Sequence, residues 1–162
     1  MKTGFQYIQP LYGYKPDIAH IAVPENCESA LEIMAADLLG TDGLIAIYIP
    51  EGTEEVYEPG VMRGRVVGGV RLLPMPPGKE MRDYFYPDWD KRMRWPLGWP
   101  CKAVYAPPVS ECRPLVDDLF GQDLFQSYVS RFQHGPFKLE AKMAKELDKF
   151  FAQFSKVRTR KN

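Results

Sequence analysis

The chain has 162 residues, of which 45% are hydrophobic and 26% are charged, and its formal net charge is zero. These values are ordinary for a globular domain and exclude collagenous and low-complexity chains. No apolar run approaches the length of a membrane span, and the N-terminus lacks the apolar core of a signal peptide. We therefore expect one domain over residues 1–162, with a basic tail over 155–162 and no membrane partner.

The cysteine and histidine content argues against a metal centre. Cys27, Cys101 and Cys112 are odd in number and lack the spacing of metal ligands, and only His20 and His134 could join them. Free cysteines favour a reducing, cytoplasmic compartment. The sequence also contains no phosphate-binding glycine loop and no nucleophile elbow. We expect neither a metal nor a cofactor, and an enzyme is the less favoured class.

Charge is distributed unevenly along the chain. Residues 17–58 contain ten acidic residues and no Lys or Arg, whereas residues 61–162 contain nineteen Lys or Arg against eleven acidic residues. Such segregation predicts a basic face that suits an anionic partner. The alternative is that the two segments interleave in space, so that their fields cancel.

The first half of the chain contains one predicted helix and two predicted strand regions. After an irregular start, residues 27–39 have the apolar spacing of a helix, with Asn26 as N-cap and Gly40 as the stop. Residues 43–50 are a short apolar run typical of a buried strand. Residues 61–78 form a second strand region, whose internal glycines predict a bulge or a close backbone approach.

The second half continues with a strand and then becomes helical. Residues 100–108 alternate like a third strand, residues 115–121 and 122–132 favour a short turn and a helix, and residues 135–154 are the clearest helix. Pro136 is expected in the first turn of that last helix. The order predicts an α+β fold, with a small, strongly bent sheet or pseudo-barrel flanked by helices.

Aromatic side chains are concentrated between residues 84 and 99. They are interleaved with cations, a combination that binds nucleic acid by stacking on bases while cations hold phosphates. Large aromatics also close the ends of small barrels, so at least half of them are expected to be structural. The aromatic residues are Tyr84, Phe85, Tyr86, Trp89, Trp95 and Trp99, and the cations are Arg82, Lys91, Arg92 and Arg94.

Three segments together resemble the PUA-like superfamily, especially EVE, YTH and ASCH domains. They are "DGLIAIYIP", "GRVVGGVRLL" and "RWPLGWPCKAVYAPP". The resemblance covers residues 40–108. It implies a pseudo-barrel sheet flanked by helices and, in EVE and YTH members, an aromatic cage for a modified base beside a basic surface. Trp95 and Trp99, with Arg94 adjacent, match the Trp/Pro-rich loop.

A second resemblance, over about twenty residues, is to acyl-homoserine-lactone synthases, which are related to GNAT acetyltransferases. It rests on "GRVVGGVRLLPMPPGKEMRDYF" and implies an acyltransferase. That family's next motif is poorly matched, because "SRF" occurs only at residues 130–132. A V-shaped split between parallel strands would favour this enzyme. A third alternative is a structural or protein-interaction domain that uses the same aromatics as core.

The preferred hypothesis is a module that binds RNA or DNA and recognises a modified base. Trp95 is expected to contact the ligand, whereas Trp99 should be the more buried of the pair. The expected ligand-binding residues are Trp95, Trp99, Arg94, Tyr84, Tyr86 and Trp89, and the expected phosphate contacts are Arg65, Arg92 and Lys102. Each proline that follows Trp95 and Trp99 favours an extended backbone at the tryptophan before it.

Overall fold

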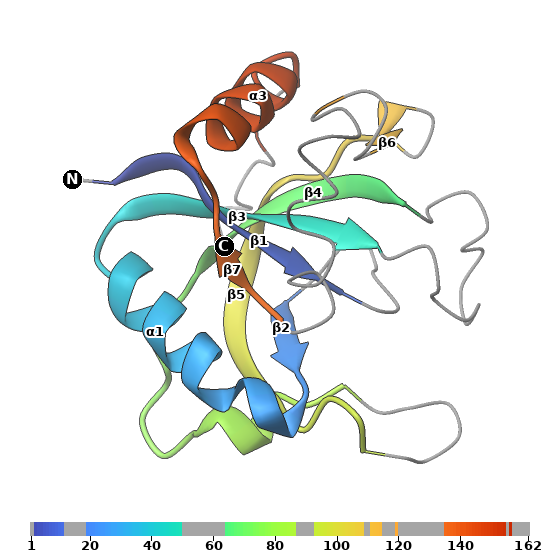
Figure 1. The fold of residues 1–162 in the computed structure, drawn as a ribbon. Helices are drawn as coiled ribbons and strands as arrows, with labels where there is room; N and C mark the ends of the chain where they lie inside the picture. Colours follow the sequence, from blue (N-terminus) through green and yellow to red (C-terminus); the bar gives the residue numbers. More distant parts are fainter. Residues whose placement is uncertain are drawn as a thin grey trace, which may run out of the picture.

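A computed structural model describes residues 2–11, 19–49, 64–86, 93–108, 111–114, 119, 135–154 and 156 (Figure 1). Its elements in chain order are β1 (Thr3–Pro10), β2 (His20–Val23), the 3-10 helix η1 (Glu25–Cys27), α1 (Glu28–Leu38), β3 (Asp42–Ile49), β4 (Arg65–Leu72), the 3-10 helix η3 (Met81–Asp83), β5 (Leu97–Tyr105), β6 (Arg113–Pro114), β7 (Phe137–Lys138) and α3 (Ala141–Phe151).

The strands form one mixed sheet. Its order is β2-β5-β4-β3-β1-β7, and the short β6 pairs with β4 beside that path. β1 and β3 are parallel, whereas every other pairing among the described strands is antiparallel. The sheet curls through 197° into a half-barrel. The predicted α+β fold, with a small bent sheet flanked by helices, is confirmed.

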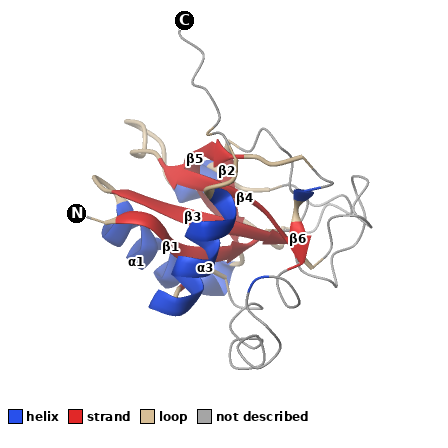
Figure 2. Ribbon diagram, turned by 90° about the horizontal axis from the view of Figure 1, so that it is seen from above, coloured by secondary structure: helices blue, strands red, loops and turns tan. Residues whose placement is uncertain are grey.

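A separate hydrophobic core packs on each face of the sheet. The first core lies against α1 and takes side chains from β1 to β5, which a curled sheet brings together. The second lies between the other face and α3, and it contains residues of β1, β3, β4 and β5. Figure 1 shows α1 and α3 on opposite sides of the sheet, and Figure 2 shows β1, β3 and β4 next to one another.

The predicted helix at 27–39 is confirmed as α1, but its predicted cap is wrong. Asn26 lies inside η1, and the N-cap position of α1 is Cys27, which makes no side-chain capping bond. The reason is that the chain enters α1 through a 3-10 turn, in which the Cys27 N–H already bonds the Pro24 carbonyl. Gly40 follows the helix with φ +80°, as expected for its stop.

The N-terminal segment, predicted to be irregular, contributes β1 and β2. An ion cluster fixes β1 to α1: Asp37 accepts hydrogen bonds from Lys2 Nζ and, at 3.0 Å, from the Tyr7 hydroxyl, and Lys138 Nζ of β7 lies at 3.7 Å. Burial, helped by Asp37, raises the pKa of Tyr7 to about 12, and the bond from Lys2 lowers the pKa of Asp37. The cluster joins three elements distant in sequence.

The glycine-rich strand region is β4, and the predicted bulge is present. The register between β4 and β5 shifts between Gly69 and Val70, and a Cβ on Gly69 would lie 2.7 Å from the Phe5 ring. β5 begins at Leu97, three residues before the predicted start at Pro100. Pro100 is tolerated inside β5, where it pairs with His20 of β2, because on the β4 side its carbonyl accepts from the Leu73 N–H and the Leu73 carbonyl takes its hydrogen bond from the Trp99 indole instead of a proline N–H.

The C-terminal helix is shorter than predicted. Pro136 does not lie in its first turn, because the chain first pairs with β1 as β7, and α3 begins at Ala141. The apolar spacing is nonetheless confirmed, since Met143, Leu147 and Phe150 are buried in the second core. The predicted elements at 115–121 and 122–132 lie outside the described residues, apart from Leu119. Among the described helices, none is long and apolar enough to cross a membrane.

Candidate functional site

Two stretches that together carry four aromatic side chains meet at the start of β5. We call residues 80–86 and 93–96 together the aromatic loop. The Tyr86 N–H donates to the Trp95 carbonyl at 3.0 Å, which makes an antiparallel bridge between the two stretches. Gly98 allows this loop to lie on β5, because a Cβ there would overlap the carbonyl oxygens of Tyr84 and Ile21. The backbone therefore fixes where Tyr84, Tyr86 and Trp95 lie.

His20, at the start of β2, lies beneath this loop. Its ring centroid is 4.4 Å from that of Tyr86 and 6.1 Å from that of Tyr84. The Tyr86 hydroxyl donates to the His20 carbonyl at 2.5 Å, and His20 Nε2 is 3.1 Å from the Phe85 carbonyl. Because a carbonyl can only accept, Nε2 carries the hydrogen. Burial lowers the pKa of His20, which favours the neutral ring.

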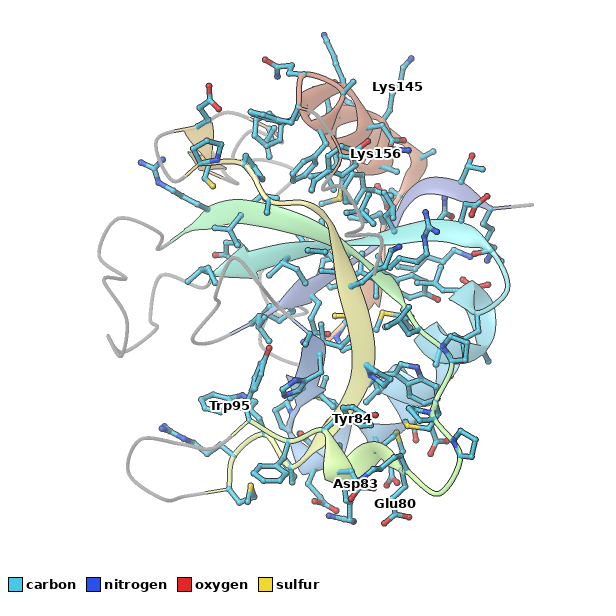
Figure 3. The ribbon with its side chains drawn as sticks, turned by 180° about the vertical axis from the view of Figure 1, so that it is seen from behind. Glu80, Asp83, Tyr84, Trp95, Lys145 and Lys156 are labelled. Carbon is cyan, nitrogen blue, oxygen red and sulfur yellow. The ribbon has the colours of Figure 1, made fainter. Side chains whose placement is uncertain are left out.

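Trp95 is half-buried and carries a cation on its face. The guanidinium carbon of Arg94 lies 5.0 Å from the centre of the Trp95 ring, a cation–π geometry. Among the described residues, three large hydrophobic side chains are exposed, and two of them, Phe85 at 41% and Met93 at 56%, belong to the aromatic loop. Figure 3 shows Trp95 and Tyr84 at the same end of the molecule. Apolar surface is thus concentrated here.

Trp99 has different surroundings from Trp95. It lies within β5 rather than on the expected loop, and its indole Nε1 donates to the Leu73 carbonyl at 2.8 Å. The ring packs against the first core. Both tryptophans are half-buried, so the expectation that Trp99 is the more buried stays a prediction. Its contacts nonetheless tie Trp99 to the core.

The predicted phosphate contacts do not gather at one place. Arg65 lies at the far end of β4 from the aromatic loop, and its guanidinium donates to the Cys112 carbonyl at 2.5 Å. Lys102 is half-buried in the middle of β5, opposite Arg71 of β4. Trp89 and Arg92 lie outside the described residues. The structure therefore brings together Tyr84, Tyr86, Arg94 and Trp95, and it leaves Arg65 apart.

The described ion pairs interleave the acidic and basic segments of the chain. Each described pair takes its carboxylate from residues 17–58 and its cation from outside that segment. Arg82 of the aromatic loop, for example, pairs with Glu25 at 2.5 Å. Among the described residues this arrangement favours the alternative in which opposite charges alternate in space.

Thiol chemistry is disfavoured at the three cysteines, which are all buried and free. Burial raises the pKa of Cys101 to about 12 and that of Cys112 to about 11, and it also raises the pKa of Cys27. The thiolate is the reactive form, so these side chains are unreactive near neutral pH. Within the described parts of the chain, no three potential metal ligands cluster.

Sequence reasoning missed three members of this site. His20 is weighed in the sequence only as a possible metal ligand, because a single histidine carries little signal. Phe85 stood in the aromatic run without being assigned to the ligand, and Met93 carries no sequence signal of its own. Their grouping arises because β2 pairs with β5, which places His20 opposite Pro100.

No protein-family model matches the chain, and no curated protein matches it. What the protein does is therefore inferred from this site and from the sequence.

Proposed function

We propose that the protein binds nucleic acid and holds one base, modified in its natural ligand, against the aromatic loop. The observation that carries this proposal is the concentration of apolar surface on that loop. Half-buried Trp95 stands beside exposed Phe85 and Met93, with the Arg94 cation on its ring. Stacking of a base on an aromatic side chain contributes about 1–3 kcal/mol.

In this proposal the residues take separate roles. Trp95 stacks on the base, and Tyr84 and Tyr86 support the loop from below, since their backbones and rings contact β5 and His20. Arg94, Lys102 and Arg92 contact phosphates, and Trp89 provides a further aromatic ring for the ligand. Arg65 is the least suited of the candidates for a phosphate contact, because its guanidinium already donates a hydrogen bond to the Cys112 carbonyl.

The curled sheet supports the resemblance to EVE, YTH and ASCH domains from which a modified base is inferred. That resemblance implies a bent sheet with a Trp/Pro-rich loop that feeds a strand, and here the aromatic loop leads directly into β5.

The acyltransferase alternative gains no support from the sheet. The one parallel pair among the described strands, β1 with β3, is matched from Thr3 to Pro10 with a single register shift. The "GRVVGGVRLL" strand, β4, is antiparallel to its neighbours β3 and β5. No V-shaped split between parallel strands is present in this part of the structure. We expect no lactone to form from an acyl donor and S-adenosylmethionine, as mass spectrometry would detect.

The proposal is tested by fluorescence anisotropy with labelled single-stranded RNA and DNA oligonucleotides at low salt. Matched oligonucleotides with and without one methylated base form the panel. We expect saturable binding and a preference for a modified base. If every oligonucleotide fails to bind at low salt, the proposal is wrong, and exposed Phe85 and Met93 are then better explained as a contact for a protein partner.

A further inference from the structure

A second candidate site lies on the face of the sheet that α3 covers. It is a pocket of about 360 Å³ where the first residues of β1 and β3 meet the last residues of β4 and β5. Figure 3 shows Lys156, which lines this pocket, close to α3 and away from Trp95 and Tyr84. The volume is at the small end of the range for ligand pockets, about 300–1,000 Å³. The pocket is therefore separate from the aromatic loop and suits a small molecule.

Arg71 contributes a positive charge to this pocket, and its guanidinium has a hydrogen-bond donor without a partner. Its Nε atom is buried without a hydrogen-bond partner, and its Nη1 atom lies 4.0 Å from Asp42 Oδ1, too far for a hydrogen bond. A buried donor without a partner costs free energy, so most such groups are paired. A ligand carboxylate in this pocket can accept hydrogen bonds from the Arg71 guanidinium.

Asp148 of α3 supplies a fixed anion. Its Oδ1 atom accepts a hydrogen bond from the Phe5 N–H at 2.8 Å. Gly4 makes this approach possible: its φ is +72°, and a Cβ there would lie 2.8 Å from both carboxylate oxygens. Asp148 and the exposed Asp42 both line this pocket. The bend at Gly4 thus brings a negative charge into the same pocket lining as Arg71.

The apolar part of the pocket is aromatic. The ring centroids of Tyr105 and Phe151 lie 5.3 Å apart, and that of Phe5 lies 4.8 Å from Phe151. Phe5 and Phe151 are almost fully buried, whereas Tyr105 is half-buried and so offers part of its ring to a ligand. An apolar or aromatic group on the ligand can pack against this wall.

We infer that this pocket binds a free α-amino acid with an apolar or aromatic side chain. The lining contains two cations, Arg71 and Lys156, and two anions, Asp42 and Asp148. A purely anionic ligand would meet the two carboxylates, and a purely cationic ligand would meet Arg71. A zwitterion matches both, with its carboxylate on Arg71, its ammonium on Asp148 and its side chain against Tyr105.

Isothermal titration calorimetry on the full chain tests this inference with L-phenylalanine and L-leucine as probes. We expect saturable binding at millimolar concentrations. L-phenylalanine methyl ester lacks the carboxylate and N-acetyl-L-phenylalanine lacks the ammonium, so each should bind at least tenfold more weakly. These two derivatives need no protein variant, which keeps the test independent of folding.

Variants then locate the ligand. Arg71→Gln should weaken L-phenylalanine binding at least tenfold, and Asp148→Asn should weaken it while keeping an acceptor for the Phe5 N–H. Lys145→Gln is the control on α3, because Lys145 is exposed and does not line the pocket. Thermal melts check that each variant is folded. The inference is overturned if neither amino acid binds, or if the two blocked derivatives bind as tightly as L-phenylalanine. It is also overturned if O-phosphoethanolamine binds more tightly than L-phenylalanine, or if Arg71→Gln has no effect on L-phenylalanine binding in a folded protein.

Discussion

Trp99 illustrates how one residue links the strand to the core. Its ring packs against the first core and its Nε1 atom bonds the Leu73 carbonyl, so both its apolar and its polar parts are used. We expect Trp99→Ala to destabilise the protein by roughly 3 kcal/mol in urea unfolding. Trp99→Phe, which removes the hydrogen bond but keeps an aromatic ring, should cost only about 1 kcal/mol. Equal, small losses for both variants would contradict this assignment.

His20 predicts how stability depends on pH. Burial lowers its pKa in the folded protein below the ordinary value of 6.5. The unfolded chain then binds a proton more readily, so the contribution of His20 to stability is present above pH 6.5 and is lost as pH falls through the lowered value. We expect the free energy of unfolding to fall from about pH 7 to about pH 5, and to fall less in His20→Gln.

The control for this prediction is His134→Gln, because His134 is the only other histidine in the chain. Carboxylates titrate equally in the wild type and in both variants, so a fall that is smaller in His20→Gln than in the wild type and in His134→Gln is assigned to His20. An NMR titration reads the pKa of the ring directly. A value above that of a free histidine would mean that the ring is not held neutral by burial.

At the residue scale, the sequence indicated the aromatic residues but not their partners. Tyr84, Tyr86 and Trp95 could be named because aromatics between cations are a local pattern. The contact of Tyr86 with His20 spans sixty-six positions, and no local pattern reports it. The position of Trp99 was misjudged for a related reason, since Pro100 suggested that β5 starts later than it does.

At the scale of elements, Gly98 holds the aromatic loop against β5. A Cβ at this position would overlap the carbonyl oxygens of Tyr84 and Ile21, which are backbone atoms and cannot rotate away. We expect Gly98→Ala to destabilise the protein by about 4 kcal/mol or more, an exceptional value for one methyl group. Chemical denaturation measures the loss.

The matched control is Gly78→Ala, on the same connection between β4 and β5. Gly78 has φ +79°, but nothing lies within 4 Å of a Cβ built there. Its substitution should therefore cost only the strain of the left-handed backbone, about 1–2 kcal/mol. A Gly98→Ala variant as stable as Gly78→Ala would show that the loop does not lie against β5 at this point.

Helices were easier to predict than strands because the spacing of the apolar residues in a helix is a local pattern. The helix at 27–39 and the apolar stripe of the last helix follow from residues three and four apart. β1 was missed because its pattern, TGFQYIQP, mixes glutamines with apolar residues and becomes a strand only through pairing with β3 and β7. The same pairing with β7 delays the start of α3, which the local pattern placed earlier.

At the scale of the whole molecule, the bend of the sheet could be predicted from the order of elements and the short, glycine-interrupted strands. The charge distribution could not, because sequence position does not say which segments face each other. Glu25, Asp37 and Asp42 each meet a cation from a distant part of the chain. Because these pairs interleave opposite charges, the proposed function does not rely on a strong electrostatic field from the whole molecule. Cations close to the aromatic loop have to bind the phosphates instead.

This arrangement predicts a limited dependence of oligonucleotide affinity on salt. Three candidate cations, Arg92, Arg94 and Lys102, would neutralise three phosphates of a single strand, which gives a slope of about −2 for log K against log salt. Anisotropy titrations over a series of salt concentrations measure the slope. Affinity that is independent of salt would mean that no phosphate is bound.

The most direct test asks whether a base stacks on Trp95. Oligonucleotide affinity and thermal stability are measured together for the wild type, Trp95→Ala and Trp99→Phe. We predict that Trp95→Ala weakens binding by roughly 1–3 kcal/mol while its melting temperature stays nearly unchanged, and that Trp99→Phe binds as the wild type does. The proposed site is contradicted if Trp95→Ala binds as tightly as the wild type, or if its main effect is a large loss of stability.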